Sequence, residues 1–442
     1  MADKASSDHP AVQAQLDRLA TLSPGRDILG LERISTLLDR LGNPERRLPP
    51  VLHVAGTNGK GSTCAFLRAA IEAAGLKAHV YTSPHLVRFN ERIRLAGRLV
   101  EDDALAALLA EALDAAEGMS ISFFEVTTAA AFLAFSRTPA DACIVEVGLG
   151  GRLDATNVIP DPIVCGIAQL GLDHAAFLGD RIEQVAAEKA GIAKHNVPLV
   201  TQSYPDKVAA PVAKAAAEAG AHWLPRGDAW DAELRDARLA YRDGKSALSL
   251  PLPRLPGDHQ ALNAALAIAM LRHQEVLDVP EAALRAAMGW TEWPARLQQL
   301  GPGPMRGILP DGAELWLDGA HNPAAARAAA DFFRAHVPAG RPFHIVFGLL
   351  ANKDGPGVLR PFRGRQITLH TVPVPNHEYH APVELAAMAR EVGLSALPAA
   401  DVDEALHWIA RHADRANPPI VLILGSLYLA GEVLRANDQP PG

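Results

Sequence analysis

The sequence predicts an α/β protein made of two domains, each a parallel sheet wrapped by helices. Short β-branched runs alternate with longer Ala-rich helical stretches over the first two-thirds of the chain, which is typical of this class. The alternation is interrupted after residue 227 and restarts after residue 293. The chain of 442 residues is also about three times as long as a common single domain. We therefore expect domains at residues 1–292 and 293–442, with the second smaller and a cleft between them.

The first domain is expected to begin its sheet at residues 51–55, where VLHVA reads as a buried strand. A helix over residues 60–74 should follow, because its Ala-rich pattern ends at Gly75. Helices are also predicted at residues 104–116 and 127–136. Further buried strands are predicted at residues 79–82, 142–147, 163–168 and 198–201.

The segment 227–256 is Pro-rich and charged, with short alternation as in SALSLPLPRLP. It predicts an antiparallel excursion or a long loop. A helix at 259–271 should follow, and the segment 290–294, with Trp293 and a proline, is the expected hinge. Beyond it, strands are predicted at 314–317, 344–347, 366–371 and 420–424, with helices at 323–336 and at the end of the chain.

Composition narrows the classes of partner and compartment. The net charge is -8 and no run of Lys and Arg is present, which argues against nucleic acid. The first residues hold no apolar run of signal-peptide length, and the longest apolar stretch, 420–431, is too short to span a bilayer. Cys64, Cys143 and Cys165 form no CxxC pair and are expected to be buried and reduced. We therefore expect a cytoplasmic protein without a membrane anchor, and a monomer.

The most informative segment is LHVAGTNGKGST at residues 52–63, where a predicted strand enters a Gly-rich turn and a helix opens at Lys60. Backbone N–H groups of such a turn and the helix N-terminus bind phosphate, and the lysine adds a mobile cation. The general phosphate-loop pattern has Ser or Thr directly after the lysine, whereas Gly61 intervenes here. An ordinary strand-to-helix turn is the alternative, but it would leave the lysine without a reason. The predicted nucleotide contacts in this loop are Thr57, Asn58, Gly59, Lys60, Gly61 and Ser62.

The loop GTNGKGS resembles the ATP loop of the folylpolyglutamate synthase and dihydrofolate synthase family, within the Mur ligase superfamily. The upstream segment LGLERISTLLDRLGNPERRLPPVLHVAGTNGKGS is also similar. The segments YTSPHL, FFEVTTAAAF, EVGLGGRLDATN, LDHAAFLG, EKAGI, GDHQALNAA and LDGAHNP follow in the order of that family. The resemblance therefore covers nearly the whole chain.

The resemblance implies a fold and an activity. The fold is a phosphate-loop ATPase domain with a parallel sheet, which binds ATP and pterin, followed by a smaller Rossmann-like α/β domain that completes the nucleotide and glutamate sites. The activity is ATP-dependent addition of L-glutamate to dihydropteroate, to (tetrahydro)folate polyglutamate, or to both, through an acyl phosphate. The alternatives are a Mur-type ligase for another carboxylate, a phosphate-loop kinase, and a non-catalytic nucleotide-binding module.

Three residues at separate predicted strand ends are candidate metal ligands: Ser83, Glu146 and His174. Carboxyl ends of parallel strands open onto a crevice where functional groups gather. Taken singly, the serine reads as a turn cap, the glutamate as a surface carboxylate and the histidine as a loop residue. The resemblance implies that they bind Mg²⁺ together with Ser62, and Mg²⁺ needs only a few protein ligands beside phosphate and water.

Lys189, in AAEKAGIAK, reads as a solvated helix lysine that could pair with Glu188. The resemblance implies instead that this lysine is carbamylated, which turns a cation into a carboxylate that holds a second Mg²⁺ near the γ-phosphate. Lys60, Lys189 and His321 are therefore the candidate catalytic residues. Dependence on a monovalent cation such as K⁺ stays open.

Two segments are expected to form the pterin pocket. The resemblance implies that Ser122 and Phe124 form one wall, and that Leu153, Asp154 and Ala155 form the other. A helix N-cap is the alternative role for Asp154. Phe123 reads as a core residue, and Arg152 reads equally well as a surface ion pair or as a contact for phosphate or substrate.

The remaining nucleotide contacts that the resemblance implies are Asn263, Arg296, Asp318 and His321. A helix cap is the competing role for Asp318 and for Asn322. Lys353 resembles a family lysine whose role is less defined. The sequence departs from the family pattern at two places. Ala295 occupies a position where the family often has glycine, and the segment PNHEYHAP lacks the Asn-Pro-Arg motif expected in the glutamate-side loop. The second departure leaves the chain-length preference open.

Overall fold

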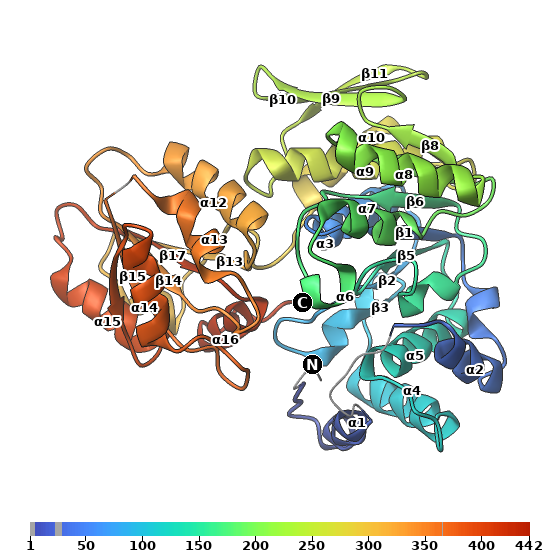
Figure 1. The fold of residues 1–442 in the computed structure, drawn as a ribbon, viewed down its shortest axis with the longest axis horizontal. Helices are drawn as coiled ribbons and strands as arrows, with labels where there is room; N and C mark the ends of the chain where they lie inside the picture. The colour runs from blue at the N-terminus through green and yellow to red at the C-terminus, as the bar shows by residue number, and fades with distance from the viewer. Residues whose placement is uncertain (1–4, 23–28, 365) are drawn as a thin grey trace. The chain divides into compact units, whose positions relative to one another are not determined.

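The computed structural model describes residues 5–22, 29–364 and 366–442 (Figure 1). The chain divides into two compact units. The first unit comprises Met1–Arg254 and His259–Glu292, and the second comprises Leu255–Asp258 and Trp293–Gly442. Each unit is an α/β structure around its own sheet, so the predicted fold class is confirmed.

The sheet of the first unit has eight strands in the order β4-β3-β2-β5-β1-β6-β7-β8. Its central strand β1 pairs in parallel with β5 and β6, and all five residues of β1 are buried. We expected a parallel sheet, but one edge is antiparallel, because β3 and β4 form a hairpin there. The strands are β1 Val51–Ala55, β2 Ala78–Tyr81, β3 Ile93–Leu95, β4 Arg98–Leu99, β5 Ala142–Glu146, β6 Val164–Ile167, β7 Pro198–Thr201 and β8 His222–Pro225.

Helices cover both faces of this sheet (Figure 1). Helix α5 begins at Phe123, four residues before the predicted start, because Ser122 and Glu125 form a capping box there. The helices are α1 Pro10–Thr21, α2 Glu32–Arg40, η1 Pro44–Arg47, α3 Lys60–Ala73, η2 Phe89–Arg92, α4 Asp102–Ala115, α5 Phe123–Arg137, η3 Ala155–Val158, α6 Ala175–Leu178, α7 Ile182–Ala190, α8 Asp206–Ala219, α9 Asp258–His273 and α10 Glu281–Trp290.

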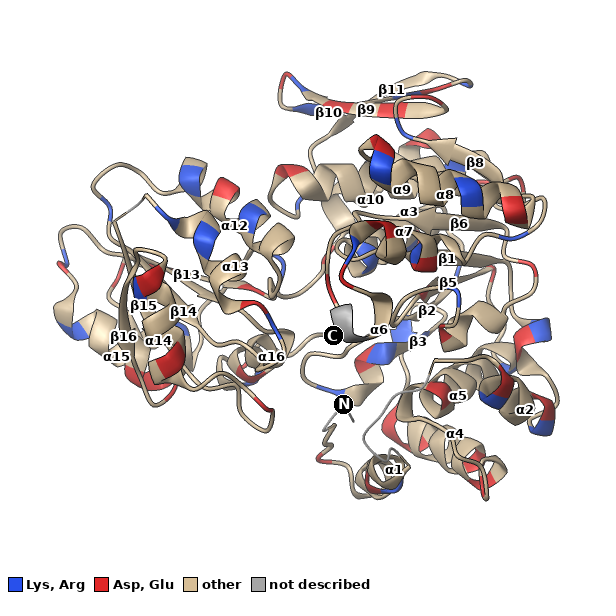
Figure 2. Ribbon diagram, viewed as in Figure 1, with Lys and Arg blue, Asp and Glu red and all other residues tan. Residues whose placement is uncertain are grey.

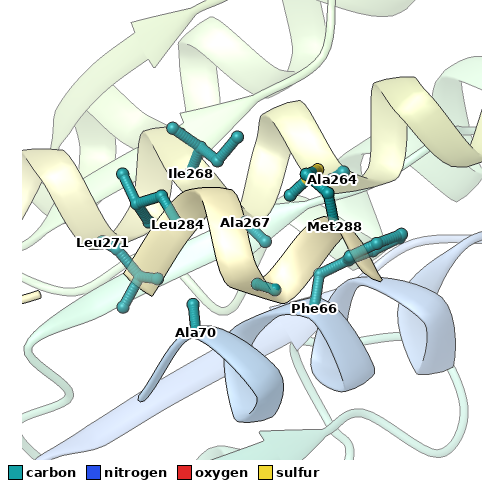
Figure 3. A pocket seen from close by; sticks show the side chains of 9 residues that line it. Phe66, Ala70, Ala264, Ala267, Ile268, Leu271, Leu284 and Met288 are labelled. Atoms are coloured by element: carbon teal, nitrogen blue, oxygen red, sulfur yellow. The ribbon is translucent and has the colours of Figure 1, made fainter. Parts of the chain in front are cut away.

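Helix α3, which follows the predicted phosphate loop, is braced by α9 and α10 (Figure 3). The space between them is lined only by apolar residues and is too narrow to hold a water molecule. Small alanines let the helices approach closely, and larger apolar side chains fill the remaining gaps. The lining residues are Phe66, Ala70, Ala264, Ala267, Ile268, Leu271, Leu284, Ala287 and Met288.

The segment expected to be an antiparallel excursion or a loop is an antiparallel sheet of β9 Trp230–Arg235, β10 Arg238–Asp243 and β11 Ala247–Pro251. It is tied to α9 by Asp243, whose side chain is fully buried and accepts hydrogen bonds from Arg272 Nε at 2.6 Å and Nη2 at 2.9 Å. Burial opposes ionisation of this carboxyl group. The hydrogen bonds from Arg272 and from the Ser246 and Lys245 backbones outweigh it, so the pKa of Asp243 is well below its usual range.

The sheet of the second unit has six strands in the order β12-β13-β17-β14-β15-β16. Only the two-residue strand β12 is antiparallel to its neighbour among the described pairs. The strands are β12 Gln298–Gln299, β13 Glu314–Asp318, β14 Phe343–Phe347, β15 Ile367–Thr371, β16 Ser395–Pro398 and β17 Ile420–Leu424. The helices are α11 Pro304–Ile308, α12 Pro323–His336, α13 Gly355–Leu359, η4 Arg360–Phe362, α14 Pro382–Glu391, α15 Val402–His412 and α16 Leu427–Ala436.

All three cysteines are buried and unpaired, as expected. Lys and Arg are interspersed with Asp and Glu along the elements of each unit (Figure 2). Within the described part of the chain, no helix has the length and apolar character needed to cross a membrane.

The buried ion pair of the excursion gives a stability prediction. Asp243→Asn should lower the free energy of unfolding by about 3 kcal/mol, because it leaves Arg272 without its buried counter-charge. Urea denaturation followed by circular dichroism measures this loss. Glu233→Gln is the matched control, since the pair of Glu233 with Arg235 is exposed and should contribute about 0.5 kcal/mol or less. Equal effects of the two substitutions would contradict a stabilising role for the buried pair.

Candidate active site

The phosphate loop lies between β1 and α3 and is fixed to the segment that follows β6. Thr57 donates its backbone N–H to Gln169 O at 2.8 Å and its hydroxyl to Gly171 O at 2.8 Å. Asn58 donates its side-chain amide to Gln169 Oε1 at 3.0 Å. The loop is therefore held by hydrogen bonds to the segment that follows β6.

Gly59 is the N-cap residue of α3 and has a left-handed backbone with φ of 87°. A Cβ atom at this position would lie 2.3 Å from Oδ1 of Asn263. Asn263 belongs to α9, is 6% exposed and donates to Gln260 Oε1 at 3.1 Å. Only glycine combines this backbone with so close an approach, so Gly59 lets α9 bring Asn263 against the phosphate loop.

Lys60 opens α3 and points to a carboxylate from a neighbouring strand. Its Nζ lies 3.9 Å from Oε1 of Glu146, which ends β5 and is only 4% exposed. Ser83 donates its backbone N–H to Glu146 Oε2 at 3.2 Å. The alternative of a surface carboxylate is therefore wrong for Glu146, and three of the predicted residues meet at the carboxyl ends of β2 and β5.

The side chains that follow Lys60 in α3 are also buried. Gly61 is buried, and Ser62 and Thr63 are 1% and 0% exposed. The hydroxyl of Thr63 has no hydrogen-bond partner within the described part of the structure. A buried polar atom without a partner is unfavourable.

His174 is placed differently from the other predicted metal ligands. It lies on an exposed loop with a left-handed backbone, φ of 54°, directly before the short helix α6. Its carbonyl accepts the backbone N–H of Leu178 at 3.0 Å. Across residues 5–22, 29–364 and 366–442, no three His, Cys, Asp or Glu side chains form a ready metal cage. A buried carboxylate with hydroxyl groups nearby is the donor chemistry that suits Mg²⁺ when phosphate and water complete the shell.

Lys189 is buried in α7, with 5% of its surface exposed. Burial, followed by the positive charge of Lys60, lowers the pKa of Lys189 to about 7, although Asp173 and Asp154 act in the opposite direction. Glu188, its neighbour, instead pairs with Arg152 at 2.7 Å on the surface. The alternative of a solvated lysine paired with Glu188 is therefore wrong.

A glycine allows the loop after β5 to cover Lys189. A Cβ atom on Gly151 would lie 2.8 Å from the carbonyl oxygen of Lys189. The backbone N–H of Arg152 donates to Glu188 O at 2.8 Å, which fixes the same loop to α7. Two roles were open for Arg152, a surface ion pair and a contact for phosphate or substrate. The structure shows the surface ion pair.

Phe124, and not Phe123, is the accessible aromatic residue at the start of α5. Phe123 is 7% exposed and packs in the core, as expected. The half-buried ring of Phe124 lies 6.0 Å from the ring of Tyr81. It also lies so close to Gly148 that a Cβ atom there would be 2.3 Å from the ring. Ser122 caps the same helix by accepting the backbone N–H of Glu125 at 3.3 Å.

Asp154 is 2% exposed and caps the 3-10 helix η3, which is the structural alternative recognised from the sequence. Its Oδ1 accepts the backbone N–H of Thr156 at 3.0 Å, and its Oδ2 accepts that of Leu149 at 2.8 Å. Burial raises the pKa of Asp154, and these hydrogen bonds limit the rise. The flanking residues differ, since Leu153 is half-buried and Ala155 is 5% exposed.

In the second unit, Asp318 ends β13 and holds two turns together. Its carboxylate accepts the backbone N–H of Leu297 at 2.7 Å and that of Ala320 at 2.8 Å. His321 Nδ1 lies 2.8 Å from Gly319 O, and Nη1 of Arg296 lies 2.8 Å from where a Cβ atom on Gly319 would be. Arg296, Asp318 and His321 are thus gathered at the carboxyl end of β13.

The neighbours of these residues show which alternatives hold. Asn322 is the N-cap of α12 and accepts the backbone N–H of Ala325 at 3.0 Å, so the cap role belongs to Asn322. Ala295 has a left-handed backbone with φ of 56°. This conformation favours glycine, which gives a physical reason for the frequent glycine at that position in the family that the sequence resembles.

The loop at residues 375–382, which lacks the expected Asn-Pro-Arg motif, is fixed by contacts within the second unit. His377 stacks on Tyr428 with 3.8 Å between ring centroids. The backbone N–H of His380 donates to Leu349 O at 3.0 Å, and His380 Nε2 lies 3.0 Å from the carbonyl oxygen of Lys353.

The chain is similar to known proteins over nearly its whole length. The dihydrofolate synthase/folylpolyglutamate synthase of Escherichia coli (strain K12) is 35% identical over 414 residues, which cover 93% of this chain and 92% of the relative. The chain belongs to the dihydrofolate synthase/folylpolyglutamate synthase family. Residues 305–427 match the family model "Mur ligase, glutamate ligase domain".

Solved structures of similar proteins agree with this family. The structure of E. coli FolC in complex with DHPP and ADP has a TM-score of 0.86 at 33% identity, and the match covers 98% of this chain and 99% of that one. A bifunctional folylpolyglutamate synthase/dihydrofolate synthase with Mn, AMPPNP and L-glutamate bound has a TM-score of 0.83 at 32% identity, with 98% and 99% covered. The family resemblance read from the sequence motifs is therefore confirmed.

Two residues that support the site of this synthase were not predicted. Gln169 binds the phosphate loop, and Gln260 bonds to Asn263. The signal for Gln260 was its place three residues before Asn263 on one helix, which is the spacing of facing side chains. No comparable signal exists for Gln169, because its contact with Asn58 joins residues 111 positions apart.

The close contact at Gly59 gives a prediction for nucleotide binding. Gly59→Ala should weaken ATP binding at least roughly tenfold, because the new methyl group displaces the loop from Asn263 and the left-handed backbone resists a side chain. Calorimetric titration with ATP measures this loss. Gly75→Ala is the matched control, since Gly75 also has a positive φ of 81° but no atom lies within 4 Å of the place that its new methyl group would occupy. Equal ATP affinities for the two variants would show that the contact with Asn263 is not needed.

Proposed function

We propose that this protein is an ATP-dependent carboxylate–amine ligase that joins L-glutamate to dihydropteroate, to tetrahydrofolate polyglutamate, or to both. The observation that carries the proposal is the contact of the buried carboxylate of Glu146 with Lys60 and with the backbone of Ser83, beside a glycine-rich phosphate loop. The E. coli relative carries both synthase names. The family assignment argues against a kinase, a non-catalytic module and a ligase for an unrelated carboxylate.

The reaction needs an activated acyl group, because amide formation from a carboxylate is unfavourable in water. The γ-phosphoryl group of ATP is transferred to an oxygen of the acceptor carboxylate, and ADP leaves. The amine of glutamate then attacks the acyl phosphate, and collapse of the tetrahedral intermediate releases phosphate and leaves the amide. Lys60 and the backbone N–H groups of residues 59–62 orient the phosphates and offset the negative charge that gathers on them.

The metal-binding role is assigned to Ser62, Ser83, Glu146 and His174. A bound Mg²⁺ would neutralise phosphate charge and hold the transferred group in line. Support comes from the burial of Glu146 and its distance to Lys60. A requirement for a monovalent cation such as K⁺ is an additional part of the proposal that activity assays in Na⁺ and K⁺ buffers would decide.

Lys189 is proposed to carry a carbamate. A lysine with a pKa of about 7 is largely a neutral amine at slightly alkaline pH, and only the neutral amine attacks CO₂ and releases a proton. The product is a carboxylate on a long side chain, which is a suitable second ligand for Mg²⁺. It would also remove the repulsion between Lys189 and Lys60.

The pterin ring is proposed to bind between Phe124 with Ser122 on one side and residues 153–155 on the other. The half-buried ring of Phe124 supplies a face for stacking. The buried carboxylate of Asp154 supplies an acceptor for ring N–H groups. Leu153 and Ala155 supply apolar surface next to that carboxylate.

Residues 1–292 are thus proposed to bind ATP and pterin, and residues 293–442 to complete the nucleotide and glutamate sites. Asn263, Arg296, Asp318 and His321 are assigned to nucleotide contacts, and His321 is also a candidate for assisting the reaction. Three buried, unpaired cysteines favour a reducing compartment, so we place the protein in the cytoplasm. We also propose that it is a monomer without a nucleic-acid or membrane partner.

Product formation tests the proposed activity directly. We expect phosphate release from ATP with Mg²⁺ only when both L-glutamate and a pterin acceptor are present, with dihydropteroate and tetrahydrofolate compared as acceptors. Lys60→Ala should lower kcat by a factor on the order of 10² to 10³, because it removes a charge that stabilises the transition state. Lys214→Ala is the control, since Lys214 is exposed on α8. Phosphate transfer without an amine would instead establish a kinase, and silence with both acceptors would overturn the folate assignment.

The carbamate on Lys189 has a separate, pH-dependent test. We expect a carbamate signal in ¹³C NMR after addition of ¹³C-bicarbonate, present at pH 8 and falling as the pH drops through about 7, where Lys189 becomes protonated. Ordinary lysines, with a pKa of about 10.4, contribute little at these pH values. Lys189→Met should lack the signal and the activity. A signal that survives in Lys189→Met would assign the carbamate to another amine.

A further inference from the structure

A chain of buried hydrogen bonds joins the strand that leads to the phosphate loop with the carboxylate assigned to pterin. His53 lies in the middle of β1 and is fully buried. Its Nε2 is 2.9 Å from the hydroxyl oxygen of Thr156, and that oxygen is 2.5 Å from Oδ1 of Asp154. His53 and Thr156 are 103 residues apart in sequence, so these hydrogen bonds form only when the protein folds.

The direction of each hydrogen bond follows from counting donors. The single hydroxyl proton of Thr156 is donated to Oδ1 of Asp154. The hydroxyl oxygen must then accept from His53, which places the imidazole proton on Nε2 and leaves Nδ1 without one. Nδ1 of His53 is buried and has no partner within the described part of the chain.

The environment of His53 favours a neutral ring. Burial, and to a smaller extent the charge of Lys194, lowers the pKa of His53 to about 3. The imidazole therefore acts near neutral pH as a single fixed donor through Nε2. It does not act as a cation that would compete for the charge of Asp154.

The carboxylate of Asp154 still has an unused acceptor position. Its Oδ1 is occupied by the hydroxyl and the backbone N–H of Thr156, whereas its Oδ2 accepts one bond, from Leu149. A carboxylate oxygen can accept two hydrogen bonds, so Oδ2 retains one position. A cap for η3 needs only the backbone N–H of Thr156, so capping alone does not explain the hydroxyl and the buried imidazole behind it.

We propose that His53 and Thr156 are positioning residues that hold the carboxyl group of Asp154 in a fixed orientation, so that Oδ2 accepts an N–H group of the bicyclic pterin ring. The inference rests on the proposed function, and in particular on the assignment of Asp154 to the pterin pocket. It adds a specificity role to a histidine on the strand that carries the phosphate loop. The matching ligand is a flat heterocycle that presents N–H donors on one edge.

Steady-state kinetics of the full-length enzyme test this role, with the better of the two pterin acceptors as the varied substrate. Thr156→Val removes the hydroxyl and keeps the shape, and it should raise KM for the pterin roughly five- to tenfold. The values of kcat and of KM for ATP should stay within about twofold of wild type, because the hydroxyl does not contact the phosphate loop. Thr156→Ser retains the hydroxyl and should restore KM for the pterin.

Two further variants separate the possible failures. Thr291→Val removes an equally buried hydroxyl at the end of α10 and should leave KM for the pterin unchanged. Asp154→Asn should raise KM for the pterin at least as much as Thr156→Val. The positioning role is overturned if Thr156→Val leaves KM for the pterin unchanged, or if it changes all the kinetic constants equally. In either case, a raised KM for the pterin in Asp154→Asn would still support the pterin pocket. If Asp154→Asn leaves KM for the pterin unchanged, Asp154 does not contact the pterin and the inference is overturned. If the wild-type enzyme turns over neither pterin, the proposed function itself is overturned.

The tautomer of His53 gives a readout that does not depend on turnover. Long-range ¹H–¹⁵N spectra of wild type, compared with His53→Gln to identify the resonance, should show a protonated Nε2 and a bare Nδ1. Thr156→Ser should keep this pattern, and the result stands even if Thr156→Val fails to fold. Protonation at Nδ1 in wild type would reverse the direction of the chain and overturn the proposal.

Discussion

The site depends on the placement of buried charges at the carboxyl ends of the parallel strands in the first unit. Lys60 and Glu146 meet there at 3.9 Å with little exposure, and Lys189 is buried close enough for Lys60 to lower its pKa. Such charges are unfavourable away from water unless they are compensated. A polyanionic ligand with a divalent cation is the kind of partner that balances two lysines and one carboxylate.

Glycine makes this arrangement possible at three points. Gly59 admits Asn263 to the phosphate loop, Gly148 admits the ring of Phe124, and Gly151 lets its loop lie on the backbone of Lys189. At each point a Cβ atom would fall within 3 Å of another group. Close packing at these glycines therefore sets the burial on which the charges of the site depend.

Several residues serve the fold and the proposed chemistry at once. Asp154 caps η3 and is assigned to the pterin pocket, and Asp318 holds two turns and is assigned to the nucleotide. The sequence presented cap and ligand as alternatives, but a carboxylate with four acceptor positions can fill both roles. Asn322 differs because it is the cap residue of α12.

The sequence by itself determined the two-domain α/β class, the phosphate loop and the family, and it predicted strand Ile420–Leu424 and helix Pro323–His336 with their observed bounds. These features depend on local periodicity and contiguous motifs, which a sequence displays directly. Only the tertiary structure decided the burial of Lys189, the pairing of Glu188 with Arg152, the antiparallel edge of the first sheet and the link from His53 to Asp154. The physical reason is that desolvation and hydrogen bonding depend on neighbours brought together by folding, and here those neighbours lie as far as 103 positions apart in the chain.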